Sequence, residues 1–275
     1  MITAEDYTFL ANLLSNTSGL ELGPDKGYLL SARLEPLAGK LGLKGISELV
    51  SKLRQNSDFK LAEDVVEAMA TQESFFFRDQ VVYDKLQEVV LPQLLERRKN
   101  IQTLRIWSAA CSRGQEPYSI AMMLALYPKE LKGWMIQIMA TDFSNSALEY
   151  AKAGLYSDLE AQRGLTKQLL NQFFSPRGEA WKINPETAQR VTFQRFNLLH
   201  PMAHLGTFDL VLCRNILIYL STDNRKRVLE AMADTLASDG FLVLGSSENM
   251  IGISDIFSRI KESRMSIYQK KGNAK

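Results

Sequence analysis

The chain has 275 residues, enough for one large domain or for a small and a medium one. It is 45% hydrophobic and 23% charged, as in an ordinary globular protein, and its net charge of +2 argues against a surface that coats nucleic acid. The two cysteines, Cys111 and Cys213, lack the spacing of a zinc site or a disulfide framework, and we expect no bound metal. No apolar run approaches the ~20 residues that span a bilayer, and Glu5 and Asp6 stand where a signal sequence would be apolar. We therefore expect a cytoplasmic protein without membrane insertion.

Residues 1–70 predict a small domain built only of helices, because apolar residues recur there at helical spacing. Between residues 26 and 60 this region holds seven basic and three acidic side chains, a local excess of four positive charges. Two interpretations stay open at this point. The charges form the solvated faces of amphipathic helices, or they form a docking surface for an acidic partner.

Residues 71–80, TQESFFFRDQ, form the junction to the rest of the chain. Three consecutive phenylalanines cannot all face one core from a single helix, so some must pack between layers or line a pocket. The flanking polar residues favour a pocket lining. The alternative is an ordinary hydrophobic anchor between domains.

From about residue 80 the pattern alternates between helices and buried strands, which predicts an α/β domain with a mostly parallel, doubly wound sheet. The first helix, over residues 81–98, is expected to be kinked or divided at Pro92. Pro117 is expected to mark the start of the helix after the first strand, and Asp239-Gly240 to end a helix over 224–236. The predicted strands cover residues 104–108, 135–140, 180–183, 191–196, 208–213, 241–245 and 265–269.

Polar side chains follow several of these strands, and in such sheets the ligand lies at the carboxyl ends of the strands. Glu116 comes after the first strand, Asp142 after the second and Arg214 after the strand at 208–213. A carboxylate that ends the second strand is typical of a group that binds ribose, because it can accept from both hydroxyls. Asp142 fits that role; the alternative is a cap for the helix that follows.

The turn after the first strand, SAACSRG at 108–114, lacks the G-x-G-x-x-G pattern of dinucleotide-binding proteins. With Gly114 as its only glycine, the turn would cradle a pyrophosphate poorly. We therefore favour a nucleoside without phosphates, and S-adenosylmethionine is the candidate of that size. Its cationic sulfonium suits nearby carboxylates, carbonyls and aromatic faces.

Five stretches, in matching order and spacing, give the chain a resemblance to a known family. They are TQESFFFRD at 71–79, SAACSRGQEPYSIAM at 108–122, ATDFS at 140–144, FDLVLCRNILIYL at 208–220 and GFLVLGSSE at 240–248. Together they resemble the CheR-type chemotaxis receptor methyltransferases over nearly the whole chain. The resemblance implies methyl transfer from S-adenosylmethionine to glutamate side chains of chemotaxis receptors, with S-adenosylhomocysteine as the product. It also implies a Rossmann-like methyltransferase domain after an all-helical N-terminal domain.

The resemblance also implies the site residues, by position. It puts Arg78 near the methionine carboxylate and the incoming glutamate, Asp142 at the ribose hydroxyls, and Arg78 and Tyr219 in catalytic roles. The implied cofactor-binding residues are Gln72, Ser74, Arg78, Glu116, Asp142, Asn197, Leu198, Arg214 and Asn215. The chain departs from the family at Gln72, where asparagine is common, and at Gln115, where glutamate is common. The first change keeps an amide with a longer reach, and the second leaves Glu116 in place.

The expected reaction fits the side chains available. A glutamate is already a carboxylate at neutral pH, so methyl transfer to it needs in-line positioning and removal of water, and no strong general base. Arg78 can hold a carboxylate with two parallel N–H bonds, and Tyr219 can donate a hydrogen bond near the sulfonium. The alternative for Tyr219 is an aromatic residue that closes the core at a strand end.

The resemblance implies domain boundaries and partners as well. Residues 1–70 would form the docking domain, 71–90 a linker and linking helix, and 91–275 the methyltransferase domain, with a small antiparallel β-subdomain inserted at about 155–190. The partner would be the glutamate-rich cytoplasmic helices of a receptor, bound through a basic face that contains Arg33, Lys40, Lys44 and Arg54. The loop FFSPRGEAWKI at 173–183 is short and holds one glycine, so we expect no tether to a receptor's C-terminal pentapeptide. We also expect a monomer.

Two other functions stay open on the sequence alone. One is a non-catalytic module that binds S-adenosylmethionine or S-adenosylhomocysteine and signals through the helical domain. The other is a small-molecule methyltransferase or an NAD enzyme. The presence of both Arg78 and Tyr219 speaks against the first, and the missing glycine pattern weakens the NAD version of the second.

Overall fold

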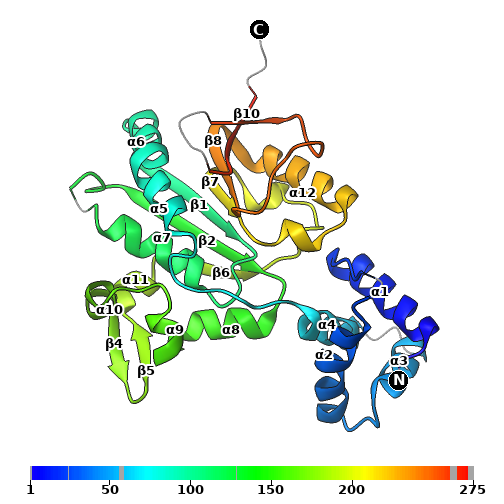
Figure 1. Ribbon diagram of the computed structural model, residues 1–275. Coiled ribbons are helices and arrows are strands. Elements are labelled where there is room, and N and C mark those ends of the chain that lie inside the picture. Colours follow the sequence, from blue (N-terminus) through cyan, green and yellow to red (C-terminus); the bar gives the residue numbers. More distant parts are fainter. Residues whose placement is uncertain (1, 24, 56–58, 128, 261–264, 272–275) are drawn as a thin grey trace. The chain divides into compact units, whose positions relative to one another are not determined.

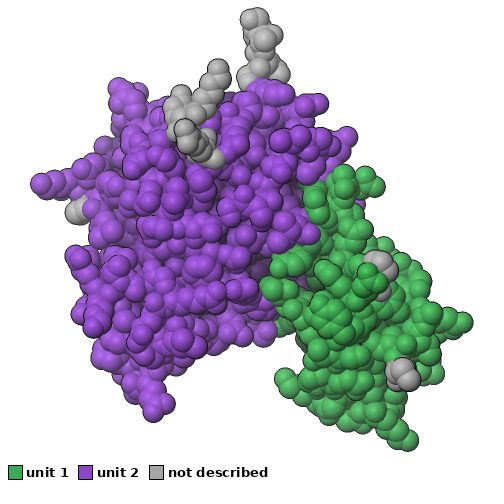
Figure 2. All heavy atoms as spheres, in the orientation of Figure 1, with its two compact units in different colours: residues 1–71, 219–225 green, residues 72–218, 226–275 purple. Residues whose placement is uncertain are grey.

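The computed structural model describes residues 2–23, 25–55, 59–127, 129–260 and 265–271. Its contacts divide the chain into two compact units, drawn in two colours in Figure 2. The first unit contains Met1–Thr71 and Tyr219–Arg225. The second unit contains Gln72–Ile218 and Lys226–Lys275.

The first unit is helical, as the spacing of its apolar residues predicts. Its helices are α1 (Ala4–Ser18), α2 (Gly27–Lys40), α3 (Ile46–Gln55) and α4 (Phe59–Met69), all visible in Figure 1. Each helix turns an apolar stripe inward, and the core side chains include Leu10, Leu14, Leu30, Leu34, Leu49, Val65 and Val66. The polar residues between these positions stay at the surface, so the basic side chains of this region are largely solvent-facing.

A short segment far along the chain completes the first unit. Leu20 forms an antiparallel bridge with Leu220, and the Glu21 N–H donates to the Tyr219 carbonyl at 2.8 Å. The Arg225 side chain donates to the Leu220 carbonyl at 2.8 Å. Main-chain pairing therefore fixes the backbone of residues 219 and 220 within the helical unit.

The second unit is built on a sheet whose described strands follow the order β6-β2-β1-β7-β8-β10-β9 (Figure 1). The first five are parallel, and β10 and β9 join them antiparallel. The strands are β1 (Thr103–Ala109), β2 (Met135–Asp142), β6 (Val191–Arg195), β7 (Phe208–Cys213), β8 (Leu236–Leu244), β9 (Phe257–Arg259) and β10 (Ile267–Lys270). β1 lies between β2 and β7, so the chain changes direction across the sheet beside β1. This switch point is where doubly wound sheets bind ligands.

Helices cover this sheet, and its central strands are largely apolar and buried. All six residues of β7 are buried, which is typical of a parallel strand with a layer on each face. The main helices are α5 (Gln80–Lys85), α6 (Leu91–Arg98), α7 (Gln115–Ala125), α8 (Asn145–Ala153) and α12 (Thr222–Thr235), with 3-10 turns at Ala203–Leu205 and Leu217–Tyr219. The predicted Rossmann-like α/β fold is confirmed.

The predicted division of the helix over 81–98 is also confirmed, and the division takes the form of a π-helical turn. α5 passes into a π-helical turn at Leu86–Val90 and then into α6, which has Pro92 as its second residue. Proline lacks an N–H, and its ring crowds the carbonyl four residues earlier. The helix therefore widens to the π geometry just before Pro92.

The expectation that Asp239-Gly240 ends a helix is wrong. α12 ends at Thr235, and β8 begins at Leu236, so Asp239-Gly240 lies inside a strand. The pairing of β7 with β8 shifts register here, and a Cβ at Gly240 would lie 2.9 Å from the Asp209 carbonyl oxygen. Arg98 holds the irregularity, because its guanidinium bonds Asp209 at 2.7 Å and Asp239 at 2.6 Å. The glycine permits close approach of two strands and stops no helix.

The expected antiparallel insertion is confirmed as a second sheet with the strand order β3-β5-β4. The strand predicted at 180–183 is β5; its two partners were not predicted. The elements of the insertion are β3 (Leu155–Ser157), α9 (Asp158–Gln162), α10 (Lys167–Phe173), β4 (Phe174–Arg177), β5 (Ala180–Ile183) and α11 (Pro185–Ala188). The insertion thus leaves the main sheet after α8 and returns to it at β6.

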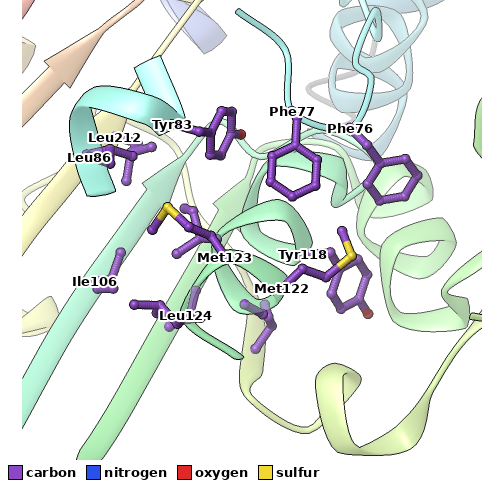
Figure 3. Close-up of a cluster of buried hydrophobic side chains, with 14 of the residues drawn as sticks. Phe76, Phe77, Tyr83, Leu86, Ile106, Tyr118, Met122, Met123, Leu124 and Leu212 are labelled. Atoms are coloured by element: carbon purple, nitrogen blue, oxygen red, sulfur yellow. The ribbon is translucent and has the colours of Figure 1, made fainter. Parts of the chain in front are cut away.

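The three phenylalanines of the junction have different surroundings. Phe76 packs edge-on against Tyr156 and Phe174 of the insertion, at centroid distances of 4.9 and 5.4 Å. Phe77 packs against Tyr83 of α5 at 5.0 Å, and Figure 3 shows both rings above the methionines of α7. Phe75 is only half-buried. Two of the three rings therefore anchor the segment in the core, and the third lies at the surface of the second unit.

Candidate active site

The turn between β1 and α7 forms the base of the candidate site. Ala110, Ser112 and Gly114 have positive φ angles of 56°, 51° and 88°, so the chain reverses within a few residues. The Cys111 N–H donates to the Thr141 carbonyl at 2.9 Å, which joins the turn to the end of β2. Pro117 is the third residue of α7 and does not mark its start, contrary to the prediction. Its missing N–H belongs to the first helical turn, where no partner within the helix exists.

Gly114 serves packing between helices. A Cβ at this position would lie 2.8 Å from the Cβ of Ala151 on α8 and 3.2 Å from the hydroxyl of Tyr156. That hydroxyl donates to the Arg113 carbonyl at 2.8 Å. The glycine is therefore required for the close contact of α7 with α8 and β3, and its left-handed φ adds to the requirement.

Asp142 ends β2 and binds the neighbouring turns. One carboxylate oxygen accepts from the Ser112 N–H at 2.8 Å, and the other accepts from the Ser144 N–H at 2.9 Å. Ser144, and not Asp142, caps α8 through its side chain. The Phe196 N–H donates to the Asp142 carbonyl at 3.0 Å, so the residues after β6 run beside the same strand end. Asp142 thus lies where three connections meet.

A buried arginine after β7 connects three parts of the second unit. The Arg214 guanidinium bonds Glu116 of α7 at 3.0 Å and Asp79 at 2.8 Å, and it donates to the Arg78 carbonyl at 2.8 Å. Glu116 in turn accepts from the Ser108 hydroxyl of β1 at 2.7 Å. Burial disfavours the charge of Arg214, but the carboxylates of Glu116 and Asp79 outweigh burial and raise its pKa. The side chain therefore stays a cation at neutral pH.

Glu248 organises the turn that follows Arg214. This buried carboxylate accepts from the Asn215 N–H at 2.8 Å, the Gly245 N–H at 2.7 Å and the Ile218 N–H at 3.3 Å. Asn215 has a φ of 59°, and a Cβ at Gly245 would lie 2.9 Å from its side-chain nitrogen. Glu248 therefore supplies the acceptors that keep the ends of β7 and β8 together.

Comparison with known proteins identifies the family. A family model described as CheR methyltransferase, SAM binding domain, matches residues 72–266, and one described as CheR methyltransferase, all-alpha domain, matches residues 5–69. The chain belongs to the CheR methyltransferase family. The chemotaxis protein methyltransferase Cher2 of Pseudomonas putida is 39% identical over 270 residues, which cover 97% of this chain and 98% of that protein. Chemotaxis protein methyltransferase 1 of Pseudomonas aeruginosa is 40% identical with the same coverage, and the chemotaxis protein methyltransferase of Borreliella burgdorferi is 30% identical over 258 residues, or 91% and 90% of the two chains.

This CheR methyltransferase uses S-adenosylmethionine as its methyl donor, and the residues of the second unit fit that cofactor. Arg113, the basic side chain of the turn, is bonded to Glu160 at 3.4 Å and lies over the Tyr150 ring at 4.9 Å. In the part of the chain that the structure describes, the Ser112 hydroxyl and the Gln115 side-chain amide oxygen are buried without a hydrogen-bond partner. The positive charge of Arg113 is thus paired within the protein, and the polar atoms left to contact a ligand are neutral. This arrangement suits a nucleoside without phosphates.

The structure connects three of the predicted site residues directly. Arg214 bonds the Glu116 carboxylate and the main-chain carbonyl of Arg78. Asp142 and Asn215 lie at the ends of β2 and β7, the two strands that flank β1. The Leu199 N–H donates to the Asn197 side chain at 3.0 Å, directly after β6, and Leu198, Gln72 and Ser74 are half-buried. Tyr219 falls in the other compact unit, so its place in the reaction site stays a prediction.

Sequence reasoning did not assign roles to three residues that shape the site. Asp79 pairs with Arg214, Ser108 bonds Glu116, and Glu248 holds the Asn215 turn. Asp79 follows Arg78 directly and Glu248 follows a predicted strand, so their positions are the signal that could have marked them as candidates. Their partners are 135 and 33 residues away in the sequence, and only the fold reveals the pairing.

The cysteines and histidines contribute no activated nucleophile or base to these contacts. Burial raises the pKa of the Cys111 thiol well above its usual value, and Asp142 raises it further; burial and Glu248 do the same for Cys213. His200 and His204 are exposed, and the His204 ring packs against Phe196 at 5.6 Å. Among the described residues, no group of three or more His, Cys, Asp or Glu could hold a metal ion, and no helix is long and apolar enough to cross a membrane.

Replacing Glu248 by glutamine tests whether its hydrogen bonds to three backbone N–H groups stabilise the fold. The glutamine keeps the size but turns an N–H₂ group toward backbone donors, so the free energy of unfolding should fall by about 1–3 kcal/mol. Urea unfolding measures the change. Glu149→Gln on exposed α8 is the matched control and should change little. Equal stability of the Glu248→Gln variant and the wild type would contradict the role given to Glu248.

Proposed function

We propose that this chain methylates glutamate side chains of chemotaxis receptors, forming glutamate methyl esters in the cytoplasm as part of sensory adaptation. The observation that carries the proposal is the full-length match to the family, with Glu116, Asp142 and Arg214 at the carboxyl ends of the strands. S-adenosylmethionine supplies a methyl group on a sulfonium, which a carboxylate can attack directly. The enzyme therefore has to position two reactants and exclude water.

We assign the cofactor contacts to residues on neighbouring connections. Both carboxylate oxygens of Asp142 accept from backbone N–H groups, and a carboxylate has about four acceptor positions, so Asp142 can also accept from ribose hydroxyls. Asn197 and Leu198 would contact the adenine edge. Glu116, Arg214, Asn215, Gln72 and Ser74 would surround the methionine end.

Arg78 and Tyr219 are the proposed reaction-site residues. The Arg78 guanidinium donates to the Glu73 carbonyl at 3.0 Å and lies over the Phe75 ring at 5.5 Å, which limits its rotamers. It would orient the incoming glutamate by hydrogen bonds to the oxygen that does not attack. Tyr219 would contribute a second hydrogen bond. Both residues would orient the substrate, and neither would remove a proton from the nucleophile.

One assay separates this proposal from a non-catalytic cofactor-binding module. The chain is incubated with methyl-labelled S-adenosylmethionine and a receptor cytoplasmic fragment. Base-labile label on glutamate residues supports the proposal. Tight cofactor binding without any transfer supports the binding module and contradicts the proposal.

Asp142→Ala should weaken binding of S-adenosylmethionine by about 1–3 kcal/mol, because the substitution removes hydrogen bonds to a charged acceptor. Isothermal titration measures the affinity. Asp158→Ala, in the insertion, is a control that should leave affinity unchanged. An unchanged affinity for the Asp142 variant would remove this residue from the cofactor site.

Arg78→Ala should lower the rate of methyl transfer by about tenfold to hundredfold and lower cofactor affinity less, because the side chain is assigned to the incoming glutamate as well as to the methionine carboxylate. Single-turnover transfer and a separate cofactor titration measure the two quantities. A loss of cofactor affinity with a normal transfer rate would show that the role at the glutamate is wrong.

We propose that the helical unit docks the acidic receptor helices through its basic face. Lys40 and Lys44 are exposed and face solvent. Arg33 donates to the Met69 carbonyl and to Thr71 at 3.2 Å, and Arg54 is paired with Asp6 at 3.4 Å. Because the two arginines already have partners, the lysines are the stronger candidates for receptor contacts.

The double substitution Lys40→Glu with Lys44→Glu should raise the KM for the receptor fragment by about fivefold or more with kcat retained, since each reversal turns attraction into repulsion. Steady-state methylation at low salt measures the change. The matched control is Lys99→Glu with Lys152→Glu, which makes the same charge change in the other unit. Equal effects of the two pairs would indicate net charge alone and would refute specific docking.

We further propose that binding does not depend on a receptor pentapeptide. Arg177 pairs with Ala180, so the β4–β5 connection is a two-residue turn of Gly178 and Glu179, with Gly178 at a φ of 60°. Such a tight hairpin lacks the glycine-rich loop expected of a tethering enzyme. Calorimetry with a receptor C-terminal pentapeptide should show no binding; measurable affinity would overturn this proposal.

The proposed division of labour follows the domain boundaries expected from the sequence. Residues 1–70 dock the receptor, 71–90 link, and 91–275 bind the cofactor and transfer the methyl group. We propose that the enzyme works as a monomer, because each of these tasks can be assigned within one chain.

A further inference from the structure

Two guanidinium groups lie over the Phe75 ring. The Arg163 guanidinium lies over its ring at 4.4 Å, and the Arg78 guanidinium lies over it at 5.5 Å. Glu73 joins them, because its carboxylate pairs with Arg163 at 2.8 Å and its carbonyl accepts from Arg78 at 3.0 Å. The ring therefore holds a second arginine beside the proposed catalytic one.

Arg163 comes from the β-subdomain insertion, and its backbone is fixed against the junction segment. It follows α9 directly, and the next residue, Gly164, has a φ of 97°. A Cβ at Gly164 would lie 1.8 Å from the Phe76 carbonyl oxygen, so the two backbones approach as closely as glycine allows. The position of Arg163 beside Phe75 is therefore set by backbone packing and does not require the ion pair with Glu73.

The cluster has an uncompensated positive charge. The hydrogen bond and charge of Arg163, and the charge of Arg78, lower the pKa of Glu73, so its carboxylate is ionised at neutral pH. One carboxylate then faces two guanidiniums. Arg163 and Glu73 are each more than half exposed, at 53% and 58%, and an ion pair so exposed is weak and can be exchanged for another.

Both arginines retain hydrogen-bonding capacity. Among the described residues, each guanidinium is bonded to protein through one nitrogen only, at Glu73. An arginine has five N–H donors, so each of the two can still bind a carboxylate in a two-pronged manner. Because both guanidiniums lie over one ring, a ligand that fits the pair carries two carboxylates close together.

We propose that Arg163 is a specificity-determining residue that binds a second carboxylate of the substrate helix, close to the glutamate held at Arg78. The inference rests on the proposed function and adds to it a substrate class. Preferred methyl-accepting glutamates have an acidic neighbour on the same helix. Glu73 occupies Arg163 in the free enzyme and is displaced by the substrate.

Arg163→Gln should raise the KM for the receptor fragment by about fivefold, with kcat and cofactor affinity nearly unchanged. Arg177→Gln, at the exposed tip of the β4–β5 hairpin, is the matched control and should behave like the wild type. The same KM for both variants would overturn the proposal. If the wild type itself transfers no methyl group to the receptor fragment, the proposed function fails, which is a different result.

Glu73→Gln separates substrate binding from a structural role of the ion pair. If Arg163 binds the substrate, loss of its internal competitor should lower the KM about twofold or more. If Arg163 acts only by holding Glu73, the glutamine variant should raise the KM as Arg163→Gln does, and the proposal would be wrong.

A substrate change completes the test. Replacing the acidic residue next to the methylated glutamate by glutamine should raise the KM of the wild type about fivefold and leave the KM of the Arg163→Gln variant unchanged. Additive losses in the two enzymes would contradict a direct contact between Arg163 and that residue.

Discussion

The candidate site of the second unit depends on the ion pairs of the buried Arg214 guanidinium. It joins the end of β7 to the start of α7 through Glu116, and to the junction segment through Asp79 and the Arg78 carbonyl. Removal of one partner of such a buried pair leaves an uncompensated charge and costs about 3–5 kcal/mol. The buried guanidinium thus holds the segment that carries Arg78 beside the strand ends, and the buried rings of Phe76 and Phe77 anchor the same segment in the core.

This arrangement suits a reaction whose nucleophile is already charged. The glutamate substrate needs no proton removed, and the buried thiols of Cys111 and Cys213 stay neutral because burial raises their pKa. What the enzyme can add is orientation and exclusion of water. Arg78 and Arg163, stacked on Phe75, would recognise carboxylates, while Asp142 and Glu116 would hold the cofactor on the opposite side of the transferred methyl group.

The alternation of helices and strands predicted the sheet, and the strand ends in turn predicted Glu116, Asp142 and Arg214 as site residues. The contacts among them could not be predicted, because Asp79 and Arg214 are 135 residues apart and pair only once the sheet order is set. Two local signals were misread for physical reasons. Pro117 suggested the start of α7 but is its third residue, and Asp239-Gly240 suggested a helix end but lies where β8 approaches Asp209. The pair of arginines on Phe75 depends on the insertion folding back on the junction, which no sequence pattern in either segment indicates.

Positioning, and not proton transfer, is what this site supplies to methyl transfer. The most direct test is the single-turnover rate of receptor methylation, at saturating cofactor and receptor, between about pH 6 and pH 9, a range in which glutamate remains ionised. A rate that is flat across this range is the predicted result. A rate that rises about tenfold per pH unit through a pKa near 7 would require a general base and would contradict the account.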